Sequence, residues 1–441
     1  MKRRYYYRLE YKEKEKRSFL KYIRLFALAL LVLTTIYMAY LLIGGRPSLT
    51  HESIKSLSLL PSKKEINLEF SLPVKSLRLT LEQEGRSVVL YEEHFKEPKK
   101  RVNFEFDAKA LGLREGKAVV FAELDAGFLR KKKQEVETFL DLTPPEFDVV
   151  AYTPNPTLGG TGVIKIKSKE EIIPSLKVGS RVYRLETFEK GYYIAFFPVR
   201  IDEALSHLEL EAYDKAGNYS KKLLPINLKT PHFKEEKLFI DDQFINTVIY
   251  PLLGQEGRGL SPVEAFKRVN ELWRQENVST LEKLGSKSES RILWEGAFLQ
   301  LPKSKVLAGY GDKRYYYYKG ELVSESRHMG YDFASVERAV VPAGNSGVVV
   351  FAKSLGIYGN TVVIDHGFGL MSLYGHLSEI WVKEGQYVKK GEPIGRTGKT
   401  GLALGDHLHF GVLVQGYEVN PIEWFDERWI ENRVMPVIHG R

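Results

Sequence analysis

The sequence contains no cysteine among its 441 residues. Disulfide bridges and cysteine-ligated metal sites are therefore excluded. The absence does not fix the compartment, because it fits both a reducing cytoplasm and a cell-envelope protein built without disulfides. With ordinary proportions of apolar residues (43%) and charged residues (27%), the chain is expected to fold into about three globular domains.

Beyond its N-terminus the chain also has little excess of positive charge. Residues 1–24 hold ten Lys or Arg and three Glu, which accounts for +7 of the net charge of +9. About +2 is left for the rest of the chain, too little for a basic nucleic-acid-binding face. We therefore expect a basic cytoplasmic tail at 1–24 and no nucleic-acid partner.

One long uncharged run follows this tail, from Leu25 to Ile43. Its nineteen residues can cross a bilayer core of roughly 30 Å as a helix, so we predict a single-pass transmembrane helix at 25–43. Positive charge before the run predicts a cytoplasmic N-terminus in the cytoplasmic (inner) membrane, with the rest of the chain in the periplasm or cell-wall space. The alternatives are a buried helix and a cleaved signal peptide, whose apolar region is usually only about 7–15 residues.

Two segments of about ninety residues then alternate polar and apolar residues in short runs, as half-buried strands do. They span 50–143 and 146–230 and are separated by a linker signal, Thr143-Pro144-Pro145. The end of the second segment, Asp214-Lys-Ala-Gly-Asn218, resembles the last hairpin of bacterial immunoglobulin-like envelope modules. We expect two immunoglobulin-like β-sandwich modules that act as spacers or bind envelope proteins.

The pattern changes to a helical period within 233–290. Ser261-Pro262-Val263-Glu264 is a capping box with proline at the first helical position, and apolar residues follow at helical spacing. Two interpretations stay open for this helical linker or regulatory segment. It packs on the next domain, or it covers a cleft until a partner moves it.

From Ile292 the sequence is β-rich again. Tyr315 to Tyr318 read as a strand with two rings facing in and two facing out, either as part of a plain hairpin or beside a cleft where they grip a ligand. His366, within a glycine-flanked turn, is either structural or groove-lining.

Histidines cluster in this last region, together with one carboxylate. The candidates are His328, Asp332, His376, His407 and His409. Nitrogen and oxygen ligands with an open position are typical of a catalytic zinc site, whereas closed structural sites usually use cysteine. His407 and His409 share one face if they lie in a strand, which favours one ring on a metal and one on the reacting group. The spacing of His328 and Asp332 suits a helix, but Gly330 and the β-rich surroundings favour a strand end and loop.

Several glycine-spaced motifs place these histidines in a known setting. They are Gly309-Tyr-Gly311, His328-x-x-x-Asp332, Tyr358-Gly-Asn360 through His366-Gly367, Leu373-Tyr-Gly-His376, Val388-x-x-Gly391-x-x-Ile394-Gly395, Gly398-x-Thr-Gly401, His407-Leu-His409-Phe410 and Asn420-Pro421. This arrangement resembles the lysostaphin/LytM-type zinc metallopeptidases over about residues 295–425. Two positions depart from the usual pattern without removing a ligand: Tyr310 stands where Phe is commoner, and Asp406 where Pro is frequent.

The resemblance implies a peptidase domain at 292–430 with a β-barrel-like duplicated-hybrid-motif fold, within a mainly β chain. It implies one Zn²⁺ per chain, held by His328, Asp332 and His409. His376 and His407 would stand above the metal as catalytic residues whose separate roles stay open. The implied activity is hydrolysis of peptide cross-links between peptidoglycan peptide stems. Some relatives have lost ligands and activate cell-wall amidases instead, so a catalytically silent regulatory scaffold is the alternative.

Overall fold

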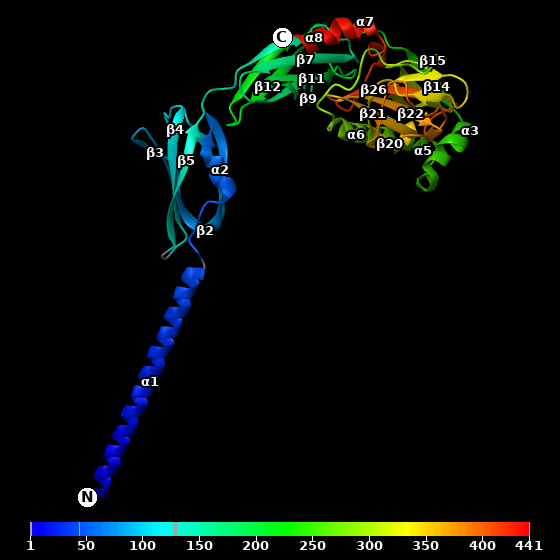
Figure 1. Ribbon diagram of the computed structural model, residues 1–441. Coiled ribbons are helices and arrows are strands. Elements are labelled where there is room, and N and C mark those ends of the chain that lie inside the picture. The colour runs from blue at the N-terminus through cyan, green and yellow to red at the C-terminus, as the bar shows by residue number, and fades with distance from the viewer. Residues whose placement is uncertain (1, 44, 128–129, 441) are drawn as a thin grey trace. The chain divides into compact units, whose positions relative to one another are not determined.

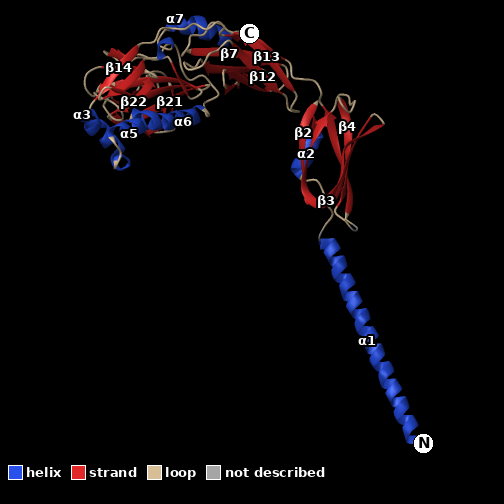
Figure 2. Ribbon diagram, turned by 180° about the vertical axis from the view of Figure 1, so that it is seen from behind, coloured by secondary structure: helices blue, strands red, loops and turns tan. Residues whose placement is uncertain are grey.

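The computed structural model describes residues 2–43, 45–127 and 130–440, with side chains described outside 2–18 and 40–43. The chain is mainly β, as predicted, and begins with a helix (Figures 1 and 2). It divides into two compact units. The first comprises the residues up to Thr143 together with Ala216–Asn218, and the second comprises Pro144–Lys215 and the residues from Tyr219 onward.

The first helix, α1, runs from Lys2 to Ile43. Its segment long and apolar enough to cross a membrane is Phe19–Ala39, 21 residues with a mean hydropathy of 1.9. This segment overlaps the predicted run of 25–43 over Leu25–Ala39. Large apolar side chains along it, such as Phe26 and Leu33, are more than half exposed, as a lipid-facing helix requires.

The rest of the first unit contains a short helix and one five-stranded sheet in the order β1-β5-β4-β2-β3. These elements are α2 (His51–Ser58), β1 (Leu59–Leu60), β2 (Lys63–Gln83), β3 (Arg86–Asp107), β4 (Gly116–Asp125) and β5 (Lys131–Leu140). The module thus has a single hydrogen-bonded sheet where two facing sheets were expected. Leu57 of α2 and alternate residues of the strands, including Ile66, Leu79 and Val120, form its core.

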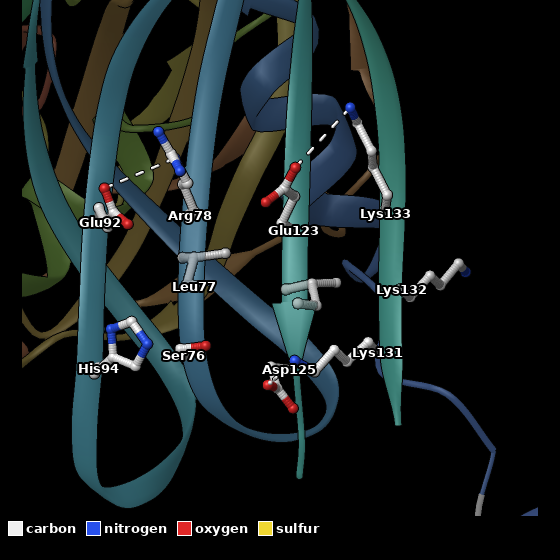
Figure 3. Close-up of a pocket in the computed structure, with 11 residues that line it drawn as sticks. Ser76, Leu77, Arg78, Glu92, His94, Glu123, Asp125, Lys131, Lys132 and Lys133 are labelled. Atoms are coloured by element: carbon white, nitrogen blue, oxygen red, sulfur yellow. Dashed lines mark ion pairs between the residues drawn. The ribbon is translucent and has the colours of Figure 1, made fainter. Parts of the chain in front are cut away.

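Charged side chains occupy the outward positions of this sheet and line a shallow hollow of about 400 Å³ (Figure 3). Arg78 pairs with Glu92, and Lys133 with Glu123, across neighbouring strands. Lys131 pairs with Asp125 at 3.2 Å. These exposed pairs satisfy one another and contribute little stability.

The second unit begins with the expected β-sandwich. One sheet has the order β10-β11-β7-β6 and the other β13-β12-β8-β9. The strands are β6 (Phe147–Tyr152), β7 (Thr161–Ser168), β8 (Ile173–Val178), β9 (Arg181–Arg184), β10 (Glu186–Glu189), β11 (Tyr192–Pro198), β12 (His207–Tyr213) and β13 (Tyr219–Pro225). Ile164, Leu176, Phe197 and Leu210 pack between the two sheets as a single core.

An eight-stranded antiparallel sheet forms the centre of the C-terminal domain. Its path is β15-β18-β26-β22-β21-β20-β24, with β27 paired to β26, and the path of described strands does not close into a barrel. The strands are β15 (Lys305–Ala308), β18 (Tyr331–Ala334), β20 (Gly347–Ser354), β21 (Asn360–Gly367), β22 (Leu370–Leu377), β24 (Tyr387–Val388), β26 (Leu408–Val414) and β27 (Tyr417–Val419). A smaller sheet joins β19 (Val340–Pro342), β25 (Pro393–Arg396) and β23 (Glu379–Ile380).

The two faces of the large sheet pack against different parts of the chain. On one face Phe410 and Val412 belong to a core with Trp294 and Trp424, which also takes in Phe196 of the β-sandwich. On the other face Val363 and Leu413 pack against the helical segment. That segment comprises α3 (Asp242–Phe244), η1 (Ile245–Ile249), α4 (Tyr250–Leu253), η2 (Gly254–Gly257), α5 (Pro262–Lys267), η3 (Arg268–Trp273) and α6 (Arg274–Gly285).

A three-stranded sheet, in the order β14-β16-β17, packs against the helical segment. Its strands are β14 (Glu235–Ile240), β16 (Lys313–Tyr318) and β17 (Glu321–Arg327). Tyr316 and Tyr318 are buried against the helices, while Tyr315 and Tyr317 are partly exposed. The four tyrosines therefore alternate inward and outward, as the sequence predicted for a hairpin strand.

The C-terminal helical turns connect the β-sandwich to the large sheet of the C-terminal domain. They are η5 (Pro421–Glu423), α7 (Glu427–Trp429), η6 (Ile430–Val434) and α8 (Met435–His439). The buried Lys165 amino group donates hydrogen bonds to the carbonyls of Ile438 and Gly440, and Glu423 accepts one from the backbone N–H of Thr161. With the shared core, these contacts make the sandwich part of the same compact unit.

Candidate metal centre

Three of the five predicted site residues point one atom each at a common centre. His328 Nε2 lies 3.0 Å from Asp332 Oδ1 and 3.1 Å from His409 Nδ1, and His409 Nδ1 lies 2.9 Å from Asp332 Oδ1. All three residues are at most 8% exposed. The three atoms therefore form a nearly equilateral triangle of metal-binding type.

The strand register places two of these residues side by side. Asp332 of β18 is paired with His409 of β26 in the antiparallel sheet, on the face that the helical segment covers further along. His328 stands before β18 rather than on a helix, as Gly330 and its surroundings indicated. Its Nδ1 lies 2.8 Å from the carbonyl of Gly309. A carbonyl only accepts, so Nδ1 carries the proton and Nε2 keeps its lone pair for the centre.

The His409 ring is enclosed by groups to which the sequence assigned no role in the site. A Cβ atom on Gly330 would lie 2.7 Å from the ring, so only glycine leaves space for it. Behind the ring, the buried Nε2 has no hydrogen-bond partner among the residues that the structure describes, and Glu418 Oε1 lies 4.0 Å from it. The hydroxyl of Tyr358 donates to the same oxygen of Glu418 at 2.8 Å. No motif marked Glu418, which reaches the site only because β27 folds back on β26.

His376, the last residue but one of β22, has a left-handed backbone conformation, φ 62°, that non-glycine residues seldom adopt. Its Nδ1 lies 2.7 Å from the carbonyl of Thr400, which again leaves Nε2 as the free acceptor. Gly359 allows this contact, because a Cβ there would lie 2.3 Å from Thr400. Such backbone outliers cluster at functional sites, where the surroundings hold them in place.

His407 lies one residue before β26 and completes the group. Its Nδ1 is 2.8 Å from the carbonyl of Gly405, and its Nε2 is 3.7 Å from Asp332 Oδ1. The rings of His376 and His407 are 4.6 Å apart between centroids, and those of His376 and His409 are 5.9 Å apart. The structure therefore brings all five predicted residues together.

Burial and mutual charge set the protonation of the group. Burial lowers the pKa of His409 to about 4, although Asp332 opposes the shift. Burial, with the charges of His407 and His409, lowers the pKa of His376 to about 3. Burial alone would raise the pKa of Asp332, but hydrogen bonds and charge from His328 and His409 hold it well below 3.8. At neutral pH the site therefore offers His376 and His409 as neutral imidazoles and Asp332 as an ionised carboxylate.

The group opens into a cavity of about 360 Å³. His328, Asp332, His376, His407 and His409 line it, together with the 402–406 loop. It is also lined by residues that the sequence did not assign to the site: Glu236, Leu238, Arg274 and Arg314. They come from β14, α6 and β16, so the helical segment and its small sheet form one wall of the cleft.

His366 lies away from this cleft. It is fully buried, its Nδ1 is 2.7 Å from the carbonyl of Ser346, and its Nε2 is 2.7 Å from the Ser372 hydroxyl. Of the two interpretations given for it, the structural one applies.

The triangle has the properties that zinc requires. Tetrahedral zinc with bonds of about 2.0–2.1 Å holds its ligands roughly 3.3 Å apart, close to the three separations found here. Two neutral imidazoles and one carboxylate are a common zinc ligand set with one position left open. The second ring nitrogen of His328, Nδ1, donates its N–H to the carbonyl of Gly309, as metal-binding histidines usually do. The residues present therefore fit one Zn²⁺.

Comparison with known proteins identifies the same segment. The model of peptidase family M23 matches residues 326–421. Peptidoglycan DD-endopeptidase ShyA of Vibrio cholerae is 44% identical over 96 residues, which cover 22% of each chain. Murein hydrolase activator EnvC of Escherichia coli is 32% identical over 139 residues, covering 32% of this chain and 33% of EnvC.

A solved structure also matches part of the chain. The catalytic domain of the antimicrobial peptidase lysostaphin from Staphylococcus simulans is 31% identical, with a TM-score of 0.26, and the match covers 30% of this chain and 98% of that one. The chain spans between about a fifth and a third of the length of the two curated relatives described above. The predicted resemblance is confirmed: the chain carries a LytM-type domain of peptidase family M23 behind an N-terminal apolar helix.

Proposed function

We propose that the chain is a zinc-dependent endopeptidase that hydrolyses peptide cross-links of bacterial peptidoglycan during cell-wall remodelling. The observation that carries this proposal is the complete group of five. Three atoms converge within about 3 Å of one another, and two further imidazoles line the same cavity, with no hydrogen bond to either Nε2 from a described residue. His328, Asp332 and His409 would hold the metal, and His376 and His407 would act on the substrate.

Zinc in such a site supplies Lewis acidity, which polarises the scissile carbonyl and lowers the pKa of water toward about 7. The chain's own residues would do the proton work. His376 and His407 each donate Nδ1–H to a backbone carbonyl, so each presents Nε2 as a base at a fixed angle. One can take a proton from the attacking water, while the other, once protonated, can donate to the leaving amine or to the developing oxyanion.

The test pairs His328→Ala with His407→Ala in the full-length chain in detergent. His328→Ala is expected to lose bound zinc and activity together, whereas His407→Ala keeps the metal and loses turnover. Zinc content is measured by mass spectrometry of the metal, and activity by the muropeptides released from purified sacculi. His232→Ala, at an exposed histidine, is the matched control. Normal digestion of sacculi by the His407 variant would disprove the role given to that ring.

A second candidate function is activation of a cell-wall amidase by a catalytically silent domain. The similarity to the activator EnvC favours it. Five filled positions favour the hydrolase, because a scaffold has no need of a complete ligand set. Zinc-free protein that stimulates an amidase and releases no peptides from sacculi would reverse this ranking.

We also propose that α1 anchors the chain in the cytoplasmic membrane with its N-terminus in the cytoplasm and its catalytic domain in the periplasm or cell-wall space. The β-modules would then be spacers or bind envelope proteins. Because the chain lacks cysteine, a single Ser87→Cys substitution at an exposed site of the first module offers a clean probe. A membrane-impermeant maleimide should label it without lysis of the inner membrane. Labelling that requires lysis would place the module in the cytoplasm.

A further inference from the structure

Arg314 stands out among the cleft residues because its guanidinium has no firm partner. Its Nε is buried without a hydrogen bond, and the side chain makes none to any residue that the structure describes. Its single ion pair joins Nη2 to Asp332 Oδ2 at 3.8 Å, beyond hydrogen-bond distance. A guanidinium that is only 19% exposed normally needs its donors satisfied, so something outside the chain is expected to meet them.

The strand that carries Arg314 aims it into the cavity. Arg314, Tyr316 and Tyr318 occupy alternate positions of β16 and so share one face. The two tyrosines are buried under the helical segment, and Arg314 lies where this cover ends and the cavity begins. It is thus an inward-facing cation at the edge of the reactive centre, outside the segment that the family model matches.

The other charges of the cavity leave Arg314 free for an anion. Arg274 is engaged, since its Nε donates to Asn270 Oδ1 at 3.0 Å. Glu236 is the register neighbour of Arg314 on β14, yet no ion pair joins the two among the described side chains. Asp332 directs Oδ1 to His328 and His409, so only its second oxygen faces Arg314.

We infer that Arg314 is a specificity-determining residue that binds a carboxylate of the substrate peptide close to the scissile bond. This inference rests on the proposed function. A planar fork of N–H donors suits bidentate binding of a carboxylate, and the guanidinium also attracts its negative charge. One extended residue spans about 3.3–3.6 Å, comparable with the 3.8 Å from Asp332 to Nη2, so the carboxylate lies within about two residues of the bond that is cut. It belongs either to the C-terminus of a stem or to the side chain of its diamino acid.

Binding of a stem tetrapeptide by the full-length chain in detergent tests the inference. The probes are the free acid, the C-terminal amide and the form amidated at the diamino acid. Wild type should bind the free acid about 10–100-fold more tightly than one of the two amides, and that amide identifies the carboxylate. Arg314→Gln should abolish this discrimination and leave both the affinity for that amide and the zinc content unchanged.

Two further variants distinguish the bidentate geometry of the Arg314 guanidinium from the effect of its positive charge alone. Arg314→Lys keeps the charge without the fork and should retain only part of the discrimination. Lys313→Gln removes a cation from the neighbouring position of the same strand, where Lys313 pairs with Glu325 at 3.2 Å, and should behave as wild type.

Three results would overturn the inference. Wild type binds acid and amides equally, or Arg314→Gln weakens acid and amides alike, or Arg314→Gln loses zinc, which would make Arg314 a positioning residue for Asp332. These failures are distinct from failure of the proposed hydrolase. Selective binding without release of muropeptides would disprove only the hydrolase. Unchanged digestion of sacculi and unchanged binding by Arg314→Gln would disprove only the carboxylate site.

Discussion

Replacing Gly330 with alanine tests the geometry of the metal centre through one methyl group. A Cβ atom at this position would lie 2.6 Å from the carbonyl oxygen of Phe410 and 2.7 Å from two atoms of the His409 ring. Gly330 does not have a left-handed backbone conformation, so the substitution acts through space alone. The carbonyl belongs to β26 within a paired sheet, so most of the displacement should fall on the ring.

The size of the displacement follows from these distances. Ordinary Cβ contacts begin near 3.4 Å, so the ring must move by 3.4 minus 2.7 Å, or about 0.7 Å. Functional groups need to be held within about 0.5 Å of their productive geometry. We therefore expect zinc affinity to fall by about 10–100-fold, the range for a misdirected ligand. Overpacking should lower the free energy of unfolding by about 1–3 kcal/mol, which leaves the chain folded.

The assay is competition for zinc against a chromophoric chelator, with circular dichroism as the check on folding. Gly405→Ala is the matched control, because a Cβ at this other glycine of the cleft meets nothing within 4 Å. It should keep wild-type zinc affinity and melting temperature. Wild-type zinc affinity in a folded Gly330→Ala protein would refute the assignment of His409 as a ligand in this orientation.

Three further predictions concern metal, core and pH. Removal of metal by a chelator should lower the melting temperature of the C-terminal unit, and added Zn²⁺ should restore that temperature. The reason is that a ligand that binds only the folded state stabilises the folded state. An unchanged melting temperature would contradict the metal site. Phe196→Ala should lower the free energy of unfolding of the same unit by about 3–5 kcal/mol, because this buried ring packs against Trp424 with 5.8 Å between centroids. Denaturant unfolding measures the change. A decrease of less than about 1 kcal/mol would mean that the β-sandwich does not stabilise the C-terminal domain. Burial raises the pKa of Glu423 from 4.5 to about 7. Between these two pH values the folded chain keeps a proton on this carboxyl that the unfolded chain releases. The free energy of unfolding should therefore fall as the pH rises from about 4.5 to about 7. Glu423→Gln should reduce this fall in thermal melts at about pH 5 and pH 7.5, and an unaltered pH dependence would assign it to other groups.

The sequence picked out the five residues that the structure brings together. Their clustering near the carboxyl end marked them as candidates, and the resemblance to the lysostaphin/LytM-type peptidases implied which of them would bind a metal. Short-range rules also predicted the strand alternation of Tyr315–Tyr318 and the capping box at Ser261, whose two reciprocal hydrogen bonds are present in α5. Local geometry decides these features, so local sequence reveals them.

Only the tertiary structure decided what surrounds the centre. Glu418, Arg314 and Arg274 lie outside every motif. Arg314 and Arg274 reach the site through strand pairing or helix packing between segments distant in sequence, and Glu418 reaches it through the β26–β27 hairpin. The same holds for Phe196, which belongs to the β-sandwich but packs in the core of the C-terminal domain. From the sequence, the sandwich was expected to be a separate module. Composition and periodicity show that one face of an element is apolar. They do not show which other segment of the chain packs against that face. That choice depends on the summed packing of whole surfaces, which exists only once the chain has folded.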